Sequence, residues 1–572
     1  MVQMPACHND LTIGKLIREY IEDNKGIFIM YILFILIIPL QDVGLPHFLG
    51  KLTNAIQNKQ SLKVPLVSII AIMFILQIGY SIADQVDIKM FPTIQKFVRE
   101  RMMNHIFEMQ KTNYEELKIG EITTKIIKMP ALMYSYMEHW KNLFIPQAVV
   151  FTVAIIYFLR QDVLIGFTLL ILITSLAYMV LSSINLCEEL ARKRDSVYNA
   201  LYEEVDDVLR NVVTVLNYNQ EGGELDRIDG YHREYTRLSQ DALKCAMKVR
   251  YIFMPIIAMY LIFFTYYMYM KVQSGKMDVG AFIAIFIIMM YLTNSMWRII
   301  GNVKDIVLKW GMITETLDMF KVCEKYKEYE TIHDAPGVPG IVFKDVTYSF
   351  IDEAGVKREL YSHLDLHLLP GQRTLIVGQI GSGKTTILKL IMKYIECTGG
   401  EIYVNNIPYS VIKPGDLRRF VGYIPQNPIL FNRTIYENIS YGAPHITKEM
   451  VDNAILELGL FDIFSKMPLG IDTNVGKYGS KISGGQRQIV WIVRTILQNP
   501  DVVLMDEPTA SIDEKTKDIV HNLLTVLMKG KTIVMVTHDA YLMKVADRVV
   551  EMKHGSVISD SLTRAKLGGF HP

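Results

Sequence analysis

Apolar stretches of membrane-spanning length recur six times in the first 296 residues. Between them the chain is polar and follows helical periodicity. A helix needs about 20 predominantly apolar residues to cross a bilayer, and the third stretch, which is the shortest, extends back through Trp140. The pattern therefore predicts an all-α domain of six membrane-spanning helices. The six stretches are Ile27–Phe48, Val64–Ile82, Leu143–Leu159, Val163–Leu181, Tyr251–Met270 and Val279–Met296.

The residues before the first stretch have the pattern of an amphipathic helix. Apolar side chains from Leu11 to Ile21 share one helical face, and Lys15, Arg18 and Glu19 lie elsewhere. Such a helix is suited to the membrane surface. We predict an interfacial elbow helix in residues 1–26, with a soluble lead-in helix as the alternative. The apolar face consists of Leu11, Leu16, Ile17, Tyr20 and Ile21.

The connections between the stretches alternate in length. Those after the first, third and fifth stretches are short, whereas Ala83–Phe144 and Ser182–Arg250 are long and hold most of the basic residues of this half. Lys and Arg are enriched in cytoplasmic loops of membrane proteins. We therefore expect an integral, multi-pass membrane protein whose long loops and termini both lie in the cytoplasm.

After the sixth stretch the composition changes to that of a soluble domain. Asp334–Gly340 contains two prolines and two glycines, which break helices and indicate a linker. Beyond it, β-rich runs such as Ile341–Phe343 and Thr374–Val377 alternate with helical patterns, as in an α/β core. We predict a transmembrane domain at 27–325, a linker at 326–340, an α/β domain at 341–562 and a tail at 563–572.

Composition and charge narrow the functional classes. Half of the 572 residues are hydrophobic and the formal net charge is only +1, so nothing points to nucleic acid as a partner. The five cysteines are scattered and lack metal-ligand spacing, so we expect reduced thiols and no disulfide framework. These cysteines are Cys7, Cys187, Cys245, Cys323 and Cys397.

A glycine-rich loop between a predicted strand and a predicted helix is typical of a phosphate site. Gly378–Thr385 reads GQIGSGKT and lies between the apolar run Thr374–Val377 and a helix expected over Thr385–Tyr394. Its backbone N–H groups and the helix N-terminus favour phosphate. Lys384 is expected to reach the β- and γ-phosphates and Thr385 to bind Mg²⁺. The nucleotide-binding residues assigned to this loop are Gly378, Gln379, Ile380, Gly381, Ser382, Gly383, Lys384, Thr385 and Thr386.

An Asp-Glu pair ends a second apolar run, Val502–Met505. Asp506 is placed to hold Mg²⁺, directly or through water. Glu507 is the expected general base, which polarises the water that attacks the γ-phosphate. Downstream of a phosphate loop, this pair predicts ATP hydrolysis.

A third motif, Ile482–Gln486, reads ISGGQ before a helix expected to begin near Gln486. A small hydroxyl, backbone N–H groups and a helix dipole all favour an anion. Together, the phosphate loop, this run and the Asp-Glu strand resemble the ATP-binding cassette (ABC) ATPases. With six membrane spans in the same chain, the sequence resembles an ABC exporter half-transporter.

The resemblance implies a site shared between two subunits. In that family the signature residues contact the γ-phosphate of ATP held by the other subunit, so ATP joins two domains and hydrolysis releases them. A homodimer would then build two complete sites, and a heterodimer remains the alternative. The signature residues implied here are Ser483, Gly484, Gly485 and Gln486.

Further positions match the family pattern. Gln426 resembles the Q-loop glutamine that contacts Mg²⁺, so the implied metal ligands are Thr385, Gln426 and Asp506. His538 resembles the switch histidine that contacts the γ-phosphate, and Asp513 matches the D-loop.

For the adenine ring, Phe350 aligns with the family's stacking aromatic, although Tyr348 is two residues away on the same expected strand face. The resemblance also makes Asn113–Gly120 and Glu203–Val215 candidates for coupling helices. Lys477, Ile489 and Trp491 depart from the usual residues around the signature and remove no catalytic group.

The resemblance implies an ATP-driven exporter that works by alternating access, with ATP and Mg²⁺ as cofactors and membrane lipid around it. An ATP-gated channel or membrane regulator is the alternative, and six spans argue against a soluble ABC ATPase. The substrate is expected to be a small molecule, lipid or peptide. Ionisable and polar residues in or near the spans are candidates for contacting it, namely Asp42, His47, Asp84, Asp87, Asn294 and Arg298.

Overall fold

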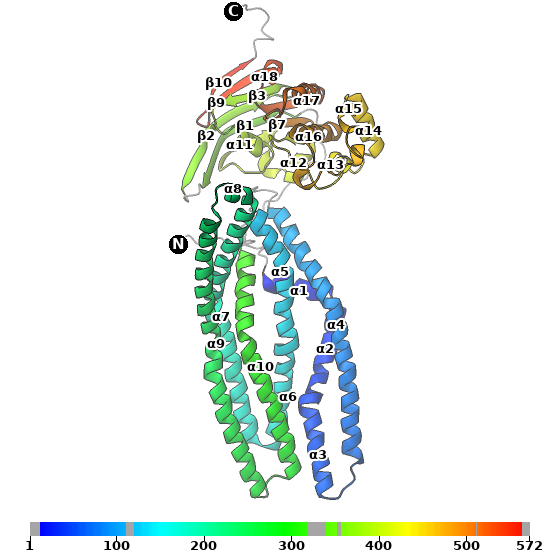
Figure 1. Cartoon of the computed structure of the whole chain (residues 1–572), viewed down its shortest axis with the longest axis vertical. Coiled ribbons are helices and arrows are strands. Elements are labelled where there is room, and N and C mark those ends of the chain that lie inside the picture. The colour runs from blue at the N-terminus through cyan, green and yellow to red at the C-terminus, as the bar shows by residue number, and fades with distance from the viewer. Residues whose placement is uncertain (1–11, 110–118, 319–338, 352–355, 511, 563–572) are drawn as a thin grey trace, which may run out of the picture. The chain divides into compact units, whose positions relative to one another are not determined.

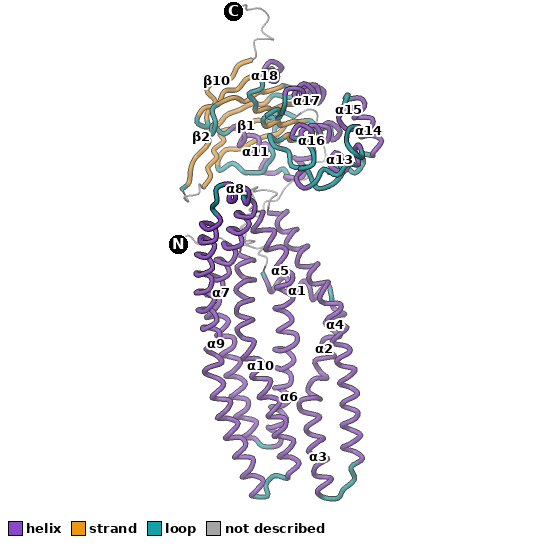
Figure 2. The backbone as a smooth tube through the Cα atoms, viewed as in Figure 1, coloured by secondary structure: helices purple, strands orange, loops and turns teal. Residues whose placement is uncertain are grey.

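The computed structural model describes residues 12–109, 119–318, 339–351, 356–510 and 512–562. These residues form two compact units. The N-terminal unit is built from helices, and within the described residues the strands occur only in the C-terminal unit, as Figure 2 shows. The predicted fold class, a helical membrane domain followed by an α/β nucleotide-binding domain, is confirmed.

The N-terminal unit contains six long apolar helical spans, each of which includes one of the six predicted stretches (Figure 1). The third span runs unbroken from Ile122 to Gln161, so the predicted extension through Trp140 is confirmed. Two spans contain a π-helical turn, η1 or η2. The elements are α1 Ile13–Asp23, α2 Lys25–Pro39, η1 Leu40–Gly44, α3 Leu45–Gln57, α4 Lys63–Met109, α5 Ile119–His139, η2 Trp140–Phe144, α6 Ile145–Gln161, α7 Val163–Arg210, α8 Val212–Asn217, α9 Glu221–Gln273 and α10 Val279–Asp318.

Small residues let the membrane helices approach closely. A Cβ on Gly280 of α10 would lie 2.2 Å from the carbonyl oxygen of Gly50 in α3. Asn54 fixes the same contact, since its Oδ1 accepts a 2.7 Å hydrogen bond from the Gly280 amide. Farther along α10, a Cβ on Gly311 would lie 2.4 Å from the Ala191 side chain of α7. Close packing of this kind stabilises helix pairs in a medium where the hydrophobic effect between helices is weak.

The predicted elbow helix forms as α1, and part of its apolar face packs on the protein. Leu16 and Tyr20 are buried, and the Tyr20 hydroxyl lies 2.7 Å from Oγ1 of Thr93 in α4. Ile21 remains exposed, whereas Leu11 lies outside the described residues. The location of α1 on the membrane surface stays a prediction.

The cysteine prediction is wrong for one pair. Cys187 of α7 and Cys245 of α9 form a disulfide, with their Cα atoms 5.9 Å apart. The two residues are 58 positions apart in sequence, and only the side-by-side packing of two long helices brings them together. Cys397 is not part of a disulfide, and its Sγ donates a 3.7 Å hydrogen bond to the Gly400 carbonyl, whereas Cys7 and Cys323 lie outside the described residues.

The C-terminal unit combines a four-stranded antiparallel sheet, in the order β2-β1-β4-β5, with a six-stranded sheet in the order β10-β9-β3-β8-β7-β6. In the larger sheet the strands from β9 to β6 are parallel. The strands are β1 Ile341–Ile351, β2 Lys357–Leu368, β3 Arg373–Gly378, β4 Gly399–Val404, β5 Ile407–Pro408, β6 Val421–Ile424, β7 Val502–Asp506, β8 Thr532–Val536, β9 Arg548–Lys553 and β10 Ser556–Leu562. The α-helices are α11 Lys384–Ile391, α12 Pro414–Phe420, α13 Ile435–Ile439, α14 Lys448–Glu457, α15 Phe461–Phe464, α16 Gly484–Gln498, α17 Glu514–Leu527 and α18 Ala540–Val545, and the short 3₁₀ turns are η3 Tyr409–Val411, η4 Gly470–Asp472 and η5 Lys477–Gly479.

The larger sheet has apolar packing on both faces. Alternate residues of β7 belong to opposite clusters, since Val503 packs with Ile489 of α16 and Leu504 packs with Ile387 of α11. This alternation follows from the two-residue period of a strand. Because both faces are buried, β7 and β8 are continuous hydrophobic runs, and polar residues are left to the strand ends.

Two predicted helices differ from the structure at one of their ends. The helix after the phosphate loop is α11 and ends at Ile391, not at Tyr394. The helix after the ISGGQ run begins at Gly484, two residues before the predicted start, because Ser483 serves as its N-cap. Most of the predicted linker 326–340, namely residues 326–338, lies outside the described residues, and the domain boundaries remain predictions.

Candidate ATP-binding and hydrolysis site

Three parallel strands carry the predicted catalytic segments to one edge of the sheet. β3 ends at Gly378, β7 at Asp506 and β8 at Val536, and β8 lies between the other two. The register pairs Asp506 with Val536 and Val536 with Ile376. Ligands of parallel α/β sheets bind outside these carboxyl ends. The phosphate loop, the Asp-Glu pair and the residues that lead to His538 therefore meet at this edge.

The backbone of the phosphate loop has a shape that a side chain would prevent. Gly383 has a φ of 98° and is the N-cap of α11. A Cβ at this position would lie 2.5 Å from the hydroxyl of the buried Tyr361 on β2, and that hydroxyl donates a hydrogen bond to the Gly383 carbonyl. Ser382 is 3% exposed, and the structure gives its hydroxyl no partner. Tyr361 thus supports the buried side of the loop, and Gln379 and Ile380 are exposed at its tip.

Lys384 spans the open loop. Its Nζ donates hydrogen bonds to the carbonyl oxygens of Gly378 at 2.8 Å and Gln379 at 3.0 Å. The neighbouring Thr385 donates a 3.3 Å hydrogen bond from Oγ1 to Oδ1 of Asp506. The first turn of α11 therefore joins the phosphate loop to the end of β7. Thr386 of that turn interacts with the Tyr361 hydroxyl.

Asp506 is a buried carboxylate at the end of β7, 8% exposed. Burial raises the pKa of Asp506, although hydrogen bonds from Thr385 and Tyr423 oppose the rise. A carboxylate that loses solvation is favoured by a nearby cation. Oxygen atoms of Thr385, Asp506 and Gln426 make up the predicted magnesium ligands, and hard oxygen ligands suit Mg²⁺.

Glu507 has a strained backbone that its surroundings enforce. Its φ is 45°, which is uncommon for a residue with a side chain. The Glu507 amide donates a 2.7 Å hydrogen bond to the Val536 carbonyl, and the Ala510 amide donates to the Glu507 carbonyl at 3.1 Å. The side-chain amide of Gln426 lies 3.3 Å from Glu507 Oε2. Strain of this kind occurs where a side chain must be aimed, often at active sites.

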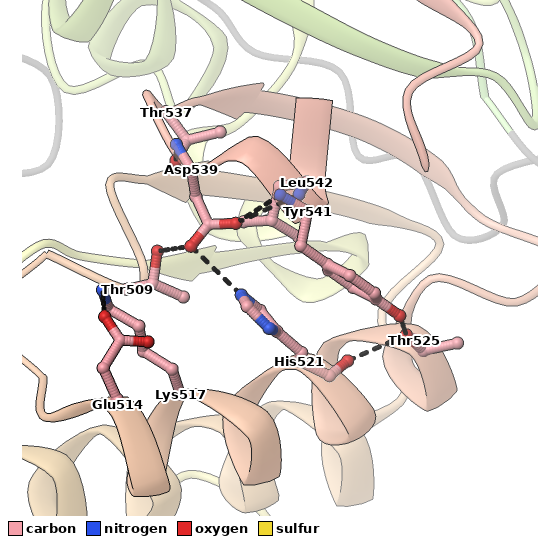
Figure 3. A network of polar contacts seen from close by, with 9 residues as sticks. All are labelled: Thr509, Glu514, Lys517, His521, Thr525, Thr537, Asp539, Tyr541 and Leu542. Atoms are coloured by element: carbon pink, nitrogen blue, oxygen red, sulfur yellow. Dashed lines mark hydrogen bonds and ion pairs between the residues drawn. The ribbon is translucent and has the colours of Figure 1, made fainter. Parts of the chain in front are cut away.

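His538 is exposed directly after β8, on the segment that connects this strand to α18. Sequence reasoning identified this histidine but missed the polar network beside it, which Figure 3 shows around Asp539 and His521. The missed residues follow no motif. The only signal in the sequence was an unexplained acidic residue next to His538.

The ISGGQ motif forms a capping box at the start of α16. Ser483 Oγ accepts a 3.2 Å hydrogen bond from the Gln486 amide, and the Gln486 side chain accepts a 2.9 Å bond from the Ser483 amide. Gly485 is buried, and a Cβ there would lie 2.5 Å from the side chain of Thr516 in α17. Ser483 stays exposed. The motif thus leaves the N-terminus of α16, a helix of 15 residues, facing solvent. A helix end of this kind favours an anion.

Asp513 is the N-cap of α17. It accepts hydrogen bonds from the Thr516 hydroxyl at 2.8 Å and the Thr516 amide at 3.1 Å. These bonds hold the pKa of the Asp513 carboxyl below its usual range. Thr516 therefore contacts both the predicted D-loop residue and, through Gly485, the signature helix.

The two candidates for adenine stacking differ in exposure. The pairing of β1 with β2 is irregular on both sides of Tyr348, so the simple alternation assumed from the sequence does not hold there. Tyr348 packs near Tyr361, with ring centroids 6.3 Å apart. Phe350 is 41% exposed. The ring that presents the more open face is therefore that of Phe350.

The departures from the family pattern have local structural explanations. Trp491 donates a 2.8 Å hydrogen bond from Nε1 to the Tyr423 carbonyl, which joins α16 to β6. Ile489 is fully buried in the core cluster of α16. Lys477 lies 5.1 Å from the ring centroid of Tyr478. At these positions the structure shows packing and leaves the predicted site residues in place.

Several of the polar candidates in the membrane helices have partners on other helices. His47 Nδ1 lies 3.1 Å from the Tyr157 hydroxyl, and Asp87 forms an ion pair with Lys141. Asp42 is buried in η1. For His47 and Asp87 the structure therefore favours interhelical pairing over substrate contact.

Comparison with known proteins agrees with this architecture. The family model of the ABC transporter transmembrane region matches residues 27–296, and the family model described as ABC transporter matches residues 361–510. A solved bacterial Atm1-family ABC exporter with ATP bound superposes with a TM-score of 0.82, covering 95% of this chain and 96% of its own at 20% identity.

Curated relatives are similar over most of this chain. An export ATP-binding/permease protein of Rickettsia prowazekii is 23% identical, covering 81% of this chain and 80% of its own length. The transport/processing ATP-binding protein ComA of Streptococcus pneumoniae is 24% identical over 82% of this chain. ATP-binding cassette sub-family B member 6 of Xenopus tropicalis is 26% identical, also over 82% of this chain. The chain spans 65% of ComA and 56% of the Xenopus protein. It belongs to the ABC transporter family, with the membrane region and the ATPase domain of an exporter half-transporter in one polypeptide.

Proposed function

We propose that this protein is an ATP-driven exporter in which two half-transporters share two ATP sites at their interface. The observation that carries the proposal is the convergence of Lys384, Asp506 and Glu507 at one sheet edge. This ATPase constellation belongs to a chain that also holds six membrane-length helices. A membrane protein with an ATPase of this kind can use nucleotide binding and hydrolysis to drive transport.

The phosphate loop supplies the binding part of this function. When ATP binds, the Lys384 ammonium would exchange its present contacts with loop carbonyls for contacts with the phosphates. The backbone N–H groups of the loop would also donate to the phosphates. Thr385, Asp506 and Gln426 would hold Mg²⁺, which neutralises charge on the phosphates when bound. The burial of Asp506 supports this assignment, because a cation would offset its lost solvation.

Glu507 supplies the hydrolytic part. Its carboxylate would accept a proton from the water that attacks the γ-phosphate. The strained backbone and the Gln426 contact fix the direction of the side chain before substrate binds. His538 would contact the γ-phosphate and orient the water. Hydrolysis would therefore depend on residues that follow three paired parallel strands.

The exposed N-terminus of α16 supports a shared site. Ser483 and Gln486 satisfy each other within the first turn and leave an anion-binding helix end facing solvent. We propose that this end contacts ATP bound to a second half-transporter. One chain carries both half-sites, Glu507 and Ser483, so two identical copies would form two complete sites. A homodimer is therefore the proposed assembly.

The short helix α8 is the proposed contact between transport and hydrolysis. It follows α7 and begins inside the predicted coupling segment Glu203–Val215. Val213 and Leu216 of α8 are 66% and 55% exposed, next to the exposed Val212 and Tyr218, and exposed apolar residues that gather in one place mark interaction sites. The other predicted coupling segment, Asn113–Gly120, lies mostly outside the described residues. This assignment places the long helical extensions and the ATPase domain in the cytoplasm.

The test is ATP hydrolysis by purified protein in lipid nanodiscs, with Glu507→Gln as the blank and Lys384→Ala as the binding-deficient control. Lipids, peptides and hydrophobic small molecules are then added by class. We expect hydrolysis that Glu507→Gln abolishes and that one class of compound stimulates. Hydrolysis that persists in Glu507→Gln would overturn the assignment of the site. Size-exclusion chromatography with light scattering would test the homodimer, and a monomer that hydrolyses ATP at the full rate would contradict the shared site.

A further inference from the structure

A largely buried carboxylate next to the switch histidine joins three segments of the ATPase domain. Asp539 follows His538 directly, and its side chain is 11% exposed. Its Oδ2 accepts hydrogen bonds from Oγ1 of Thr509 at 3.0 Å and from Nε2 of His521 at 3.1 Å. Figure 3 shows both bonds converging on this oxygen. Thr509 lies two residues after Glu507, so one carboxylate contacts both catalytic segments and helix α17.

The other oxygen of Asp539 fixes its own loop. Oδ1 accepts hydrogen bonds from the backbone amides of Tyr541 at 2.9 Å and Leu542 at 3.2 Å, which caps α18. The Asp539 amide donates a 3.0 Å bond to Thr537 Oγ1. His538 therefore lies between two residues whose side chains both accept hydrogen bonds. Its backbone position depends on where Asp539 is held.

The His521 side chain is fixed by its surroundings. Its side chain is 13% exposed, and the Tyr541 ring stacks on it with centroids 4.3 Å apart and an interplanar angle of 20°. The Tyr541 hydroxyl lies 3.0 Å from Oγ1 of Thr525, one turn farther along α17. Two contacts thus attach the His538 segment to α17, a hydrogen bond and a stacked ring anchored at its far end (Figure 3).

The first turn of α17 touches the parts of the site that face a second subunit. Asp513 caps this helix, and Thr516 contacts Gly485 of the signature helix. A helix of 14 residues is stiff over this length. A displacement at its start, when the signature meets a nucleotide, would therefore be carried to His521 and Asp539.

We propose that His521 and Asp539 are positioning residues for ATP hydrolysis. They hold the His538 segment and the Glu507 turn in register with α17, so that closure at the signature aligns both groups on the attacking water. The inference rests on the proposed roles of Glu507 and His538. In this proposal neither positioning residue touches nucleotide. Their effect falls on the chemical step, because nucleotide binding uses the phosphate loop, which they do not contact.

Steady-state ATPase kinetics in nanodiscs test the proposal. Asp539→Ala and His521→Ala should lower kcat by about 10- to 100-fold, since small misplacements of reacting groups cost this much. KM for ATP should stay within about twofold, the pattern expected when only the transition state loses an interaction. His521→Gln should restore most of kcat, because the Gln amide can donate to Asp539 from a similar position. Thr509→Val removes the other donor to Oδ2 and should also lower kcat.

A matched control removes a histidine–carboxylate contact elsewhere in the domain. His363→Gln alters the exposed pair of His363 with Asp345 between β1 and β2, and should leave kcat and KM unchanged. Thermal unfolding of each variant measures stability separately. The proposal is overturned if Asp539→Ala and His521→Ala keep the wild-type kcat, or if His521→Gln is as impaired as His521→Ala. A fall in kcat that only matches the loss of folded protein would overturn it as well.

The outcome also separates this inference from the function on which it rests. If Glu507→Gln retains hydrolysis, the proposed site itself is wrong. If Glu507→Gln is inactive while Asp539→Ala and Thr509→Val are fully active, only the positioning role fails.

Discussion

The side-chain amide of Gln426 lies 3.3 Å from the carboxylate of Glu507, although 81 residues separate them in the sequence. Gln426 follows β6 and Glu507 follows the neighbouring strand β7, so parallel pairing brings their side chains together. In this arrangement a residue proposed to contact Mg²⁺ also restrains the proposed base. Glu507 makes this contact from its unusual backbone conformation, with a φ of 45°.

Replacing Glu507 with Gln should abolish hydrolysis without abolishing ATP binding. The substitution preserves the shape of the side chain and its contact with Gln426, but an amide cannot accept the proton from water. We expect kcat to fall by about 100-fold or more, as is typical for loss of a general base. ATPase assays and binding of a fluorescent nucleotide measure the two effects. Glu514→Gln, which alters an exposed carboxylate seven residues later, is the control and should hydrolyse ATP normally.

Removing the exposed aromatic ring of Phe350 should weaken ATP binding. A ring that stacks on a base contributes about 1–3 kcal/mol, so Phe350→Ala should raise the KM for ATP by about 5- to 150-fold. Phe350→Tyr keeps the ring and should keep the KM. Tyr348→Ala provides the comparison and should raise the KM less, because Tyr348 packs against Tyr361 and is not the predicted stacking residue. A larger KM effect from Tyr348→Ala than from Phe350→Ala would reverse the assignment.

Adding a methyl group to Gly280 should destabilise the membrane unit. The new Cβ would lie 2.2 Å from the Gly50 carbonyl oxygen and 2.3 Å from Asn54 Oδ1, so α3 and α10 must separate. Overpacking of this kind costs about 1–3 kcal/mol. Gly301→Ala on the same helix is the control, since nothing lies within 4 Å of its Cβ position. Thermal unfolding in detergent should show a lower Tm for Gly280→Ala alone, and equal Tm values for the two variants would contradict this packing.

Acid should remove the stabilising contribution of Asp539. Burial alone raises its pKa, but hydrogen bonds from the Leu542 amide, His521 and Thr509 outweigh burial and hold that pKa below its usual range. The Lys517 ammonium also acts on this carboxylate. A carboxyl whose pKa is lower in the folded state stabilises the fold above the unfolded value of about 3.9, and the contribution is lost as pH falls through the folded value.

The difference in Tm between wild type and Asp539→Asn should therefore be larger at pH 7 than at about pH 3.5, a value just below the unfolded pKa. Thermal unfolding at the two values of pH measures it. A Tm difference that does not shrink in acid would show that the ionised carboxylate contributes nothing to stability.

The sequence predicted the features that depend on local pattern. Six apolar stretches became six helical spans, and the glycine loop before Lys384 formed between a strand and a helix as expected. The Asp506–Glu507 pair fell at a strand end because an apolar run that is buried on both faces must end where polar residues begin. The order of the motifs was enough to predict that these groups form one site.

The features that the sequence did not reveal depend on contacts between distant segments. The pairing of Cys187 with Cys245 requires two particular helices to lie in register. The packing of Tyr361 behind Gly383 requires β2 to pass under the phosphate loop. The irregular pairing around Tyr348 breaks an alternation that the local pattern alone suggests. None of these contacts leaves a period or a motif in the chain.

The disulfide between α7 and α9 closes a covalent ring around α8. The ring contains the end of α7, all of α8 and the start of α9. A protease that cuts the backbone once between Cys187 and Cys245 would therefore leave two pieces still tied together, which separate only when a thiol reductant is added. For the same reason, a force on α8 would be transmitted to both α7 and α9. The two linked helices would therefore move together when the proposed coupling contact is displaced.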